Sequence, residues 1–263
     1  ALAAKDGPIV PLIAETGGMN AMIVDSSALL EQVTQDVMQS AFGSAGQRCS
    51  ALRVLFIQKD VDSRFKELLK GAMSEWKVGD PRYLSTDVGP VIDEQALKVL
   101  NNHIDNFKSK FSVIAECSQP QDMQQGYFVS PIAFEIPCMA ELKTEVFGPV
   151  LHVVTFEAKD LSNVVEQINN CGYGLTLGLQ SRIGETVDYV RKYAHVGNFY
   201  VNRNIIGAVV GLQPFGGEGL SGTGPKAGGP YYLPRLCHER TFTVDTTAAG
   251  GNASLMSLSD EGI

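Results

Sequence analysis

Apolar residues in this chain switch repeatedly between helical and strand-like spacing, and this alternation constrains the fold more than any other feature of the sequence. Helical spacing occurs in segments bounded by polar residues or glycine, at 27–42, 62–72, 93–107, 161–168 and 186–194. Strand-like apolar runs lie between them, at 51–57, 111–117, 132–136, 150–156, 174–180 and 197–202. Strands that alternate with helices favour an α/β fold with a mostly parallel sheet flanked by helices.

The two ends of this pattern carry further local predictions. Residues 11–15 are apolar up to Glu15, which predicts a strand that ends at this carboxylate, and Arg240–Asp245 predict a last strand. Asp62 is expected to cap the helix that follows it, because a short carboxylate can accept a hydrogen bond from a free amide of the first turn. Residues 246–263 are small and polar, and we expect a flexible tail.

Composition excludes several classes of function. Of the 263 residues, 44% are hydrophobic and 19% are charged, which is typical of a globular protein. The net charge of −8 argues against nucleic-acid binding, which needs a basic surface. The longest apolar run, 205–212, is too short to cross a bilayer, and residues 1–12 lack the apolar core of a secretion signal. We therefore expect a cytoplasmic protein.

Cysteine and histidine spacing suggests neither a disulfide framework nor a metal site. The cysteines are odd in number and form no C-x-x-C pair, which is typical of free thiols in a reducing compartment; they are Cys49, Cys117, Cys138, Cys171 and Cys237. The four histidines are scattered and show no metal-ligand spacing, so no bound metal is expected.

The segment 211–230, GLQPFGGEGLSGTGPKAGGP, contains eight glycines in twenty residues. Gly217, Gly219 and Gly222 have the G-x-G-x-x-G spacing of a dinucleotide-binding turn, but such a turn must lead into a helix. The prolines and further glycines that follow Gly222 exclude a helix, which argues against a dinucleotide site. Two interpretations remain: a mobile surface linker, or a rigid loop whose bare backbone approaches a ligand.

Cys49 is the strongest candidate for a nucleophile. It lies between a helix that ends at Gly43 and the strand at 51–57, among small and polar residues rather than aliphatic ones. Positive charge on the neighbouring Arg48, together with exposed backbone amides, would favour the thiolate, which is the nucleophilic form of cysteine. The alternative is a cysteine that only fills space in the core.

Glu15 is the second residue with candidate chemistry. It is followed by Thr-Gly-Gly, which predicts a sharp turn. A carboxylate at such a position can serve as a general base if it is partly desolvated, because burial raises its pKa toward neutrality. The alternative is an ordinary solvated glutamate in a turn.

Four short motifs together resemble those of the aldehyde dehydrogenase superfamily: AETGGMN at 14–20, GQRCSA at 46–51, EVFGPV at 145–150 and PFGG at 214–217. Longer matches, such as YVNRN and GAVVG, are similar to one branch of it. That branch is the L-glutamate γ-semialdehyde (pyrroline-5-carboxylate) dehydrogenases, which occur in bifunctional bacterial enzymes of proline utilisation. The resemblance runs from about residue 8 to about residue 251 and implies an aldehyde dehydrogenase-like catalytic domain.

This resemblance implies roles for individual residues. Cys49 would be the nucleophile that adds to the aldehyde carbon, and Glu15 would activate the water that hydrolyses the resulting thioester. Glu145 would hold the ribose beside the nicotinamide of NAD, and Phe147 would pack near the nicotinamide ring. The implied reaction is the NAD-dependent oxidation of the semialdehyde to glutamate.

The resemblance also implies a purpose for the glycine-rich segment and its neighbours. Backbone amides of Gly207 and Ala208 would bind the α-carboxylate of the substrate, Phe215 would flank its aliphatic chain, and Ser50 would touch it. The bare backbone would then approach an amino acid rather than a pyrophosphate.

The family pattern begins upstream of residue 1, so the resemblance implies a fragment. Residues 1–45 would be a remnant of the NAD-binding domain, 46–239 the catalytic domain, and 240–263 a C-terminal strand with a flexible tail. The phosphate turn and an oxyanion-hole asparagine would lie upstream, as would a proline dehydrogenase part that uses FAD. Little turnover is expected from such a fragment, since one oxyanion donor is worth roughly 3–4 kcal/mol.

Two alternatives stay open at this point. The chain could be a non-catalytic module that builds a homo-oligomer or binds a partner through a strand at 240–246. Alternatively, the thioester could pass its acyl group to another thiol. Glu15, as a base for water, favours hydrolysis over acyl transfer.

Overall fold

A computed structural model describes residues 5–118, 126–209 and 211–245. A seven-stranded sheet forms its centre, with the order β3 (Ser112–Glu116), β4 (Ile132–Glu135), β5 (Val150–Phe156), β2 (Val54–Gln58), β1 (Ala21–Val24), β7 (Thr176–Gln180) and β8 (Asn198–Val201). All neighbouring strands run parallel except the edge pair β3 and β4. The mostly parallel α/β sheet expected from the sequence is confirmed.

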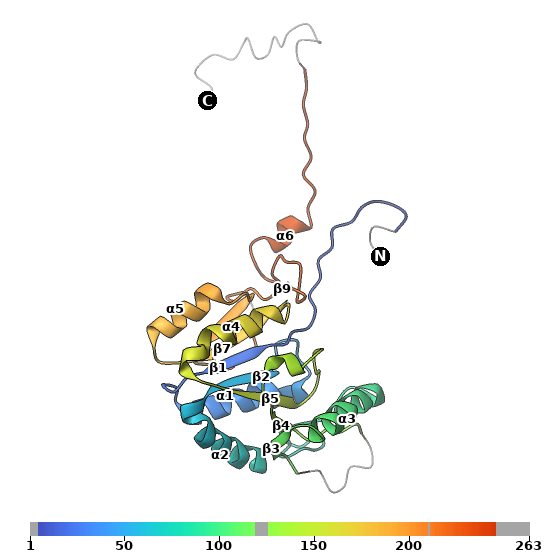
Figure 1. Cartoon of the computed structure of the whole chain (residues 1–263). Helices are drawn as coiled ribbons and strands as arrows, with labels where there is room; N and C mark the ends of the chain where they lie inside the picture. Colours follow the sequence, from blue (N-terminus) through green and yellow to red (C-terminus); the bar gives the residue numbers. More distant parts are fainter. Residues whose placement is uncertain (1–4, 119–125, 210, 246–263) are drawn as a thin grey trace.

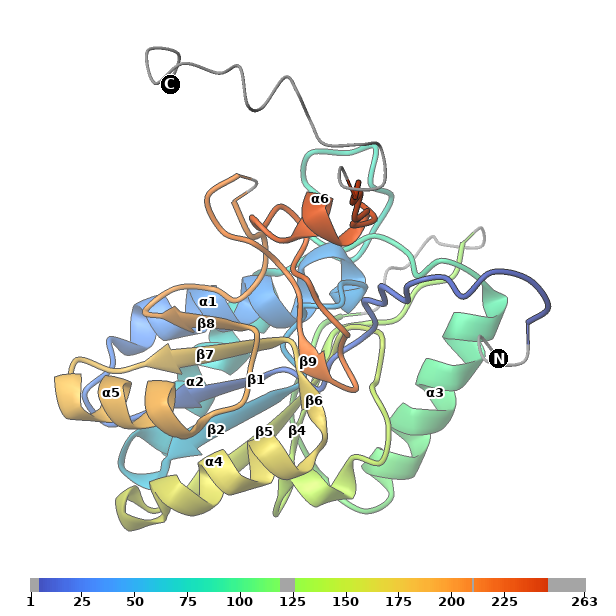
Figure 2. The ribbon, with the colours of Figure 1, turned by 90° about the horizontal axis from the view of Figure 1, so that it is seen from above.

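Helices cover both faces of this sheet (Figure 1). Helices α1 (Leu30–Phe42) and α2 (Lys59–Glu75) lie on one face, and α4 (Leu161–Asn170) and α5 (Gly184–Tyr193) lie on the other (Figure 2). Helix α3 (Glu94–Lys108) packs beside β4 and β5, where the ring of Phe107 contacts Phe134 and His152. The smaller elements are β6 (Tyr173–Gly174), β9 (Glu218–Gly219), α6 (Tyr232–Arg235) and 3-10 turns at Gly43–Gly46, Met139–Glu141 and Ala158–Asp160.

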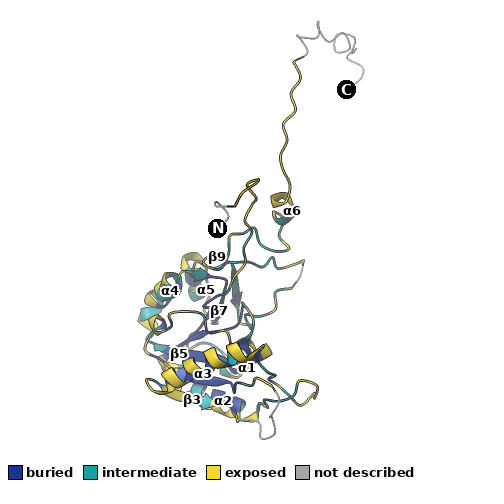
Figure 3. Cartoon of the chain, turned by 90° about the vertical axis from the view of Figure 1, so that its right-hand side faces the viewer, coloured by how far each residue is buried: buried dark blue, intermediate teal, exposed yellow. Residues whose placement is uncertain are grey.

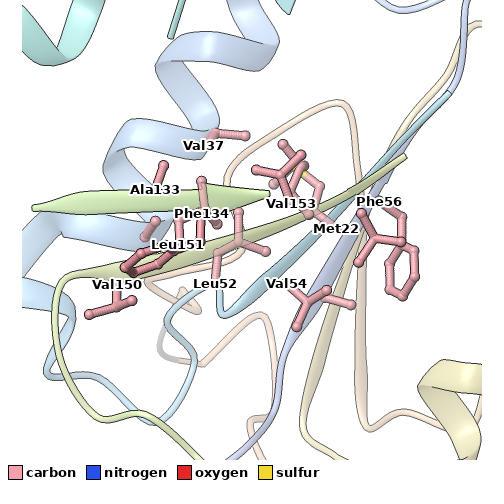
Figure 4. Close-up of a cluster of buried hydrophobic side chains, with 14 of the residues drawn as sticks. Met22, Val37, Leu52, Val54, Phe56, Ala133, Phe134, Val150, Leu151 and Val153 are labelled. Atoms are coloured by element: carbon pink, nitrogen blue, oxygen red, sulfur yellow. The ribbon is translucent and has the colours of Figure 1, made fainter. Parts of the chain in front are cut away.

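The central strands are apolar on both faces because helices cover both faces. Every residue of β1, β2 and β7 is buried. The core draws side chains from β1, β2, β4, β5 and α1, including Met22, Phe56 and Val37 (Figure 4). In Figure 3 the central strands are dark blue, whereas residues 236–244, which follow α6, are exposed. No helix among the described residues is long and apolar enough to span a membrane.

Two local predictions are wrong. Strand β1 begins only at Ala21, and Glu15 forms an isolated bridge to Gly222 instead of ending a strand. Helix α2 begins at Lys59, so Asp62 lies inside its first turn and pairs with Lys66.

The C-terminal strand at 240–245 stays a prediction. Residues 240–244 are exposed and belong to none of the strands in the described part of the chain, so a strand here would need a second chain to supply its hydrogen bonds. The flexible tail expected at 246–263 lies outside the described residues.

The division of the chain at residue 45 stays a prediction. Within the fold, β1 lies between β2 and β7, and α1 contributes Val33, Val37 and Phe42 to the same core. Residues 21–42 are therefore structurally continuous with the rest of the sheet, whatever their evolutionary relation to a cofactor domain.

Two histidines meet where α3 packs on the sheet: His152 of β5 is fully buried, and His103 of α3 is partly buried. The Nδ1 of His152 is 2.9 Å from the backbone oxygen of Arg53, and its Nε2 is 3.0 Å from Nε2 of His103. Because a carbonyl only accepts, His152 must carry its proton on Nδ1 and accept from His103 at Nε2. Burial lowers the pKa of His103 to about 4 and that of His152 to about 3, so both rings are neutral in the folded protein near pH 7.

Acid is expected to destabilise the fold through this pair. An unfolded histidine takes up a proton near pH 6.5, whereas the folded pair does so only near pH 4 and pH 3. Between these values the unfolded state binds more protons, so the free energy of unfolding falls as the pH drops. The slope should reach at most about 1.4 kcal/mol per pH unit for each histidine, and less for the partly exposed His103.

Urea unfolding between pH 7 and pH 4 measures this slope. His103→Gln keeps an N–H donor toward His152 but cannot titrate, so its stability should depend less steeply on pH than that of the wild type. His195→Gln, at an exposed position, is the matched control and should retain the wild-type slope. Identical slopes for the wild type and His103→Gln would show that the buried pair is not responsible.

Candidate active site

The segments that carry the sequence motifs converge at one edge of the sheet. Residues 14–20 precede β1, residues 46–51 precede β2, and residues 145–148 precede β5. The strands start nearly level with one another, because Ala21 pairs with Val54 and Val54 with His152. Parallel strands in this register bring the three segments together at their amino-terminal ends.

A left-handed turn delivers Cys49 to this edge. Ser44, Ala45 and Gly46 have φ values of 56°, 54° and 64°, a conformation that costs energy in residues other than glycine. A Cβ on Gly46 would lie 2.1 Å from the carbonyl oxygen of Gly148, so only glycine fits there. We call residues 44–51 the cysteine loop; its backbone touches the segment at 145–148, the Glu145 loop.

The side chain of Asn20 forms hydrogen bonds that connect the starts of strands β1, β2 and β7 next to Cys49. Its buried side chain donates from Nδ2 to the carbonyl oxygens of Cys49 at 2.6 Å and Ala51 at 2.9 Å. Its Oδ1 accepts from the backbone N–H of Thr176 at 3.1 Å. These bonds satisfy backbone groups that the strand ladders leave free, and they fix the carbonyl of the nucleophile itself.

A cavity of about 550 Å³ opens in front of Cys49. Four predicted site residues line it, namely Cys49, Ser50, Ala208 and Phe215, together with Gln47, Arg48, Gly211, Gln213, Ala227 and Gly228. Gly207 is adjacent to the lining, is exposed, and has a φ of 71°. The cavity therefore joins the cysteine loop to residues more than 150 positions away in the sequence, as the substrate roles require.

The glycine-rich segment 211–230 is a hydrogen-bonded loop and not a free linker. Asn198 donates to the carbonyl of Pro214 at 3.0 Å, while Phe215 and Ala227 exchange backbone bonds of 3.0 and 2.8 Å. No α-helix follows directly on its G-x-G-x-x-G spacing, which confirms that this spacing does not form a dinucleotide turn. These hydrogen bonds, and the residues of the segment that line the cavity, favour the second interpretation, a loop whose bare backbone approaches a ligand.

The same loop fixes the position of Glu15. Thr16 donates to the carbonyl of Ser221 at 3.1 Å, and Thr223 donates to the carbonyl of Ala14 at 3.0 Å. A Cβ on Gly216 would lie 3.4 Å from Oε1 of Glu15, which places the carboxylate beside the loop that carries Phe215. Glu15 is exposed, so the desolvation expected for this base does not occur in the described chain.

The surroundings of Cys49 raise the pKa of its thiol, whereas the sequence predicted that Arg48 would favour the thiolate. Burial raises the pKa of the Cys49 thiol, and the charges of Glu145 and Glu15 raise it further, while the N–H groups of Ser50 and of Cys49 itself lower it only in part. The Nε of Arg48 instead donates to the hydroxyl of Ser44 at 3.0 Å, and the side chain is exposed. The predicted stabilisation of the thiolate by its neighbour is therefore wrong, and the resting form near pH 7 is the thiol.

Glu145 and Phe147 lie beside the cysteine loop but do not line the cavity. The Oε1 of Glu145 is 3.3 Å from Nη2 of Arg53, and the ring of Phe147 lies 5.3 Å from that guanidinium. The Oε2 lies directly over Gly17, where a Cβ would stand 1.7 Å from it. This carboxylate is 15% exposed and the Phe147 ring remains open to solvent.

These two residues fit the nicotinamide end of a dinucleotide. A partly exposed carboxylate oxygen can accept hydrogen bonds from ribose hydroxyls, and an exposed aromatic face can pack on a nicotinamide ring. A G-x-G-x-x-G turn that leads into a helix, as the pyrophosphate needs, is absent from residues 5–118, 126–209 and 211–245. Within the same residues no three His, Cys, Asp or Glu side chains gather as metal ligands would.

Two residues that organise the site were not predicted from the sequence, namely Asn20 and Arg53. Arg53 is 1% exposed and stands in the apolar run ALRVLFI. A charged residue in a run that must be covered on both faces needs buried partners, and that is the signal which could have identified it. Asn20 carries a weaker signal of the same kind at the start of AMIV.

Comparisons with known proteins identify the family of this chain. The model of the aldehyde dehydrogenase family matches residues 1–242. The chain is 58% identical over 239 residues to the bifunctional protein PutA of Escherichia coli (strain K12), which covers 89% of this chain and 18% of that protein. It is 39% identical over 235 residues to the 1-pyrroline-5-carboxylate dehydrogenase of Geobacillus sp. (strain WCH70), covering 89% of this chain and 44% of the relative.

Solved structures show the same similarity. A bifunctional proline utilization A protein superposes with a TM-score of 0.89 at 56% identity, over 95% of this chain and 25% of that one. A 1-pyrroline-5-carboxylate dehydrogenase from Thermus, solved with bound NAD, gives a TM-score of 0.78 at 35% identity, over 85% and 43% of the two chains. This chain spans less than half the length of each of these relatives.

Removal of the Glu145 charge is expected to make Cys49 more reactive. In Glu145→Gln a carboxylate that raises the pKa of the thiol is gone, so iodoacetamide should alkylate Cys49 about two- to fivefold faster at pH 8. Peptide mass spectrometry follows the alkylation as a function of pH. Glu185→Gln, in an exposed position on α5, is the matched control, and a rate in Glu145→Gln no higher than in this control would contradict the assigned cause.

Proposed function

Because this chain belongs to the aldehyde dehydrogenase family, we propose that its cysteine site oxidises L-glutamate γ-semialdehyde to glutamate with NAD. The observation that carries the proposal is the cavity in which Cys49 meets Ser50, Ala208 and Phe215. Similarity to PutA proteins and to 1-pyrroline-5-carboxylate dehydrogenases supports the choice of substrate.

The first step is the addition of the Cys49 sulfur to the aldehyde carbon. The raised pKa means that the thiol must pass its proton to solvent as the substrate enters, and the N–H groups of Ser50 and Cys49 then stabilise the sulfur anion. Addition makes the carbon tetrahedral, and only then can the carbon–hydrogen bond release its electron pair. Bound NAD would supply the hydride acceptor, held at its ribose by Glu145 and at its ring by Phe147.

Loss of hydride leaves a thioester on Cys49, and hydrolysis completes the reaction. Glu15 is exposed and its carboxylate lies beside Gly216, so water reaches it freely next to the cavity. The carboxylate takes a proton from water while the water oxygen adds to the thioester carbon and the sulfur leaves. A carboxylate in contact with water favours hydrolysis over transfer of the acyl group to another thiol.

The far end of the cavity suits an amino-acid carboxylate. In the described part of the chain the amides of Gly207 and Ala208 donate to no protein acceptor, whereas the amide of Val209 donates to Oε1 of Gln213 at 2.9 Å. Free amides on a positive-φ turn bind anions well. Phe215 lines the same cavity, and its ring would pack against the methylene groups of the substrate.

A role in assembly is a second candidate for the C-terminal segment. Phe242 is 86% exposed and Val244 is 59% exposed, which is unusual for two apolar side chains so close in sequence. A homo-oligomer that covers them is compatible with catalysis at Cys49.

Substitution of the two catalytic residues separates the chemical steps. In the full protein that contains this chain, Cys49→Ala should lower kcat for NADH formation by at least about a thousandfold, because no sulfur can add to the aldehyde. Cys138→Ala removes a cysteine that does not line the cavity and should leave kcat unchanged. Full activity of Cys49→Ala would disprove the proposed function.

Glu15→Gln should instead stop the reaction after the first turnover. We expect a burst of NADH, an acyl adduct on Cys49 detectable by mass spectrometry, and a steady-state rate about a hundredfold lower. If the adduct never accumulates, Glu15 is not the base for hydrolysis. If an added thiol takes the acyl group faster than water in the wild type, the reaction is acyl transfer.

Gly17→Ala tests the role of Glu145 without touching either residue of the chemistry. The new Cβ would lie 1.7 Å from Oε2 and must displace the flexible carboxylate, so the KM for NAD should rise about tenfold while Cys49 remains reactive. Gly184→Ala, where a Cβ meets nothing within 4 Å, is the control. An unchanged KM for NAD would mean that Glu145 does not hold the cofactor.

A further inference from the structure

Arg53 connects two loops of the site through one buried guanidinium. Its Nη1 donates to the carbonyl oxygens of Gly46 at 2.7 Å and Gly148 at 3.2 Å. Its Nη2 donates to the carbonyl oxygen of Arg48 at 3.0 Å and to Oε1 of Glu145 at 3.3 Å. Three of these acceptors are backbone oxygens, so the side chain fixes the paths of both loops.

Burial of the Arg53 charge is an expensive way to stabilise a fold. The side chain is 1% exposed, and a buried charge loses the hydration that it would have in water. Its Nε is buried and finds no hydrogen-bond partner within the described residues. The hydrogen bonds of Nη1 and Nη2 to the two loops therefore set the orientation of the guanidinium, and they do so although Nε makes no hydrogen bond.

The contacts of Arg53 bear directly on Cys49. The carbonyl that Nη2 holds belongs to Arg48, the residue immediately before the nucleophile, while Asn20 holds the carbonyl of Cys49 itself. Both peptide groups that flank the Cys49 side chain are therefore fixed by buried donors. Because its Nη2 is 3.0 Å from the carbonyl oxygen of Arg48, the positive charge of Arg53 lies beside the peptide group that precedes Cys49, opposite in sign to the carboxylates that raise the pKa of this thiol.

We propose that Arg53 is a positioning residue for the dehydrogenase reaction, and this inference rests on the proposed function. Its guanidinium locks the cysteine loop to the Glu145 loop, so that the attacking sulfur and the ribose-binding carboxylate keep one relative geometry. It also supplies the positive charge that favours ionisation of Cys49, a role that the sequence suggested for Arg48. A lysine can supply the charge but not the planar fork of donors.

Alkylation of Cys49 tests the electrostatic part without any cofactor. Iodoacetamide rates are measured from pH 6 to pH 10 by peptide mass spectrometry, with exposed Cys237 of the same molecule as the reference. In Arg53→Met the ratio of Cys49 to Cys237 alkylation at pH 8 should fall about tenfold, which corresponds to a rise of about one pKa unit. Arg53→Lys should restore the ratio to within about threefold of the wild type, because it keeps the charge.

A merely structural role predicts a different result. Arg53→Met and Arg53→Lys would both unfold at lower urea concentration, but in the folded proteins the alkylation ratio at Cys49 would stay at the wild-type value. That outcome overturns the proposal. If Arg53→Met does not fold, the double variant Arg53→Met/Glu145→Gln leaves no unpaired buried charge; its ratio must fall below that of Glu145→Gln alone, and equal ratios overturn the proposal.

Kinetics of the full protein test the geometric part. Arg53→Lys keeps the charge but loses the fork that reaches Glu145, so its KM for NAD should rise about tenfold while Cys49 alkylation stays near the wild-type rate. An unchanged KM would overturn the coupling of the two loops. If the wild type oxidises no semialdehyde, the proposed function fails, whereas the alkylation ratios still decide whether Arg53 sets the reactivity of Cys49.

Discussion

The register of the parallel strands, which places their amino-terminal ends side by side, is the constraint on which the rest of this structure depends. Strands β1, β2 and β5 begin level with one another, so the segments that precede them must meet at one edge. Backbone N–H and C=O groups in those segments make no hydrogen bonds to a neighbouring strand and need other partners. Two buried side chains provide them, Asn20 beneath the cysteine loop and Arg53 between that loop and the Glu145 loop. The active-site geometry follows from how these donors are placed.

The charges around Cys49 serve different steps of the proposed reaction. Glu15 and Glu145 make ionisation of the thiol harder, yet the first would prepare water and the second would hold the ribose. A site with two carboxylates near a nucleophilic sulfur therefore benefits from a compensating cation that does not block the cavity. Arg53 meets this requirement because it approaches from the buried side and does not line the cavity.

Glycine has two separate functions at this site, and neither is to bind a pyrophosphate. At Gly46 and Gly17 the missing Cβ lets the Glu145 loop approach. An added Cβ would lie 2.1 Å from the carbonyl oxygen of Gly148 at the first position and 1.7 Å from Oε2 of Glu145 at the second, so neither site accepts a side chain unchanged. In the segment 211–230 the glycines belong to a hydrogen-bonded loop that carries Phe215 to the cavity and steadies Glu15. The dinucleotide-like spacing in that segment is a by-product of this loop.

The sequence by itself determined the α/β class and most of the helices and strands, and it singled out Cys49 as the candidate nucleophile, because periodicity and short motifs are local properties. It also indicated Ser50, Ala208 and Phe215 through family resemblance, and the structure places them around one cavity. Only the tertiary structure decided that Glu15 stays exposed, that the Cys49 thiol is protonated at rest, and that Arg53 rather than Arg48 is the buried cation. Burial, desolvation and charge proximity depend on residues distant in sequence, and no local pattern records which of them will meet.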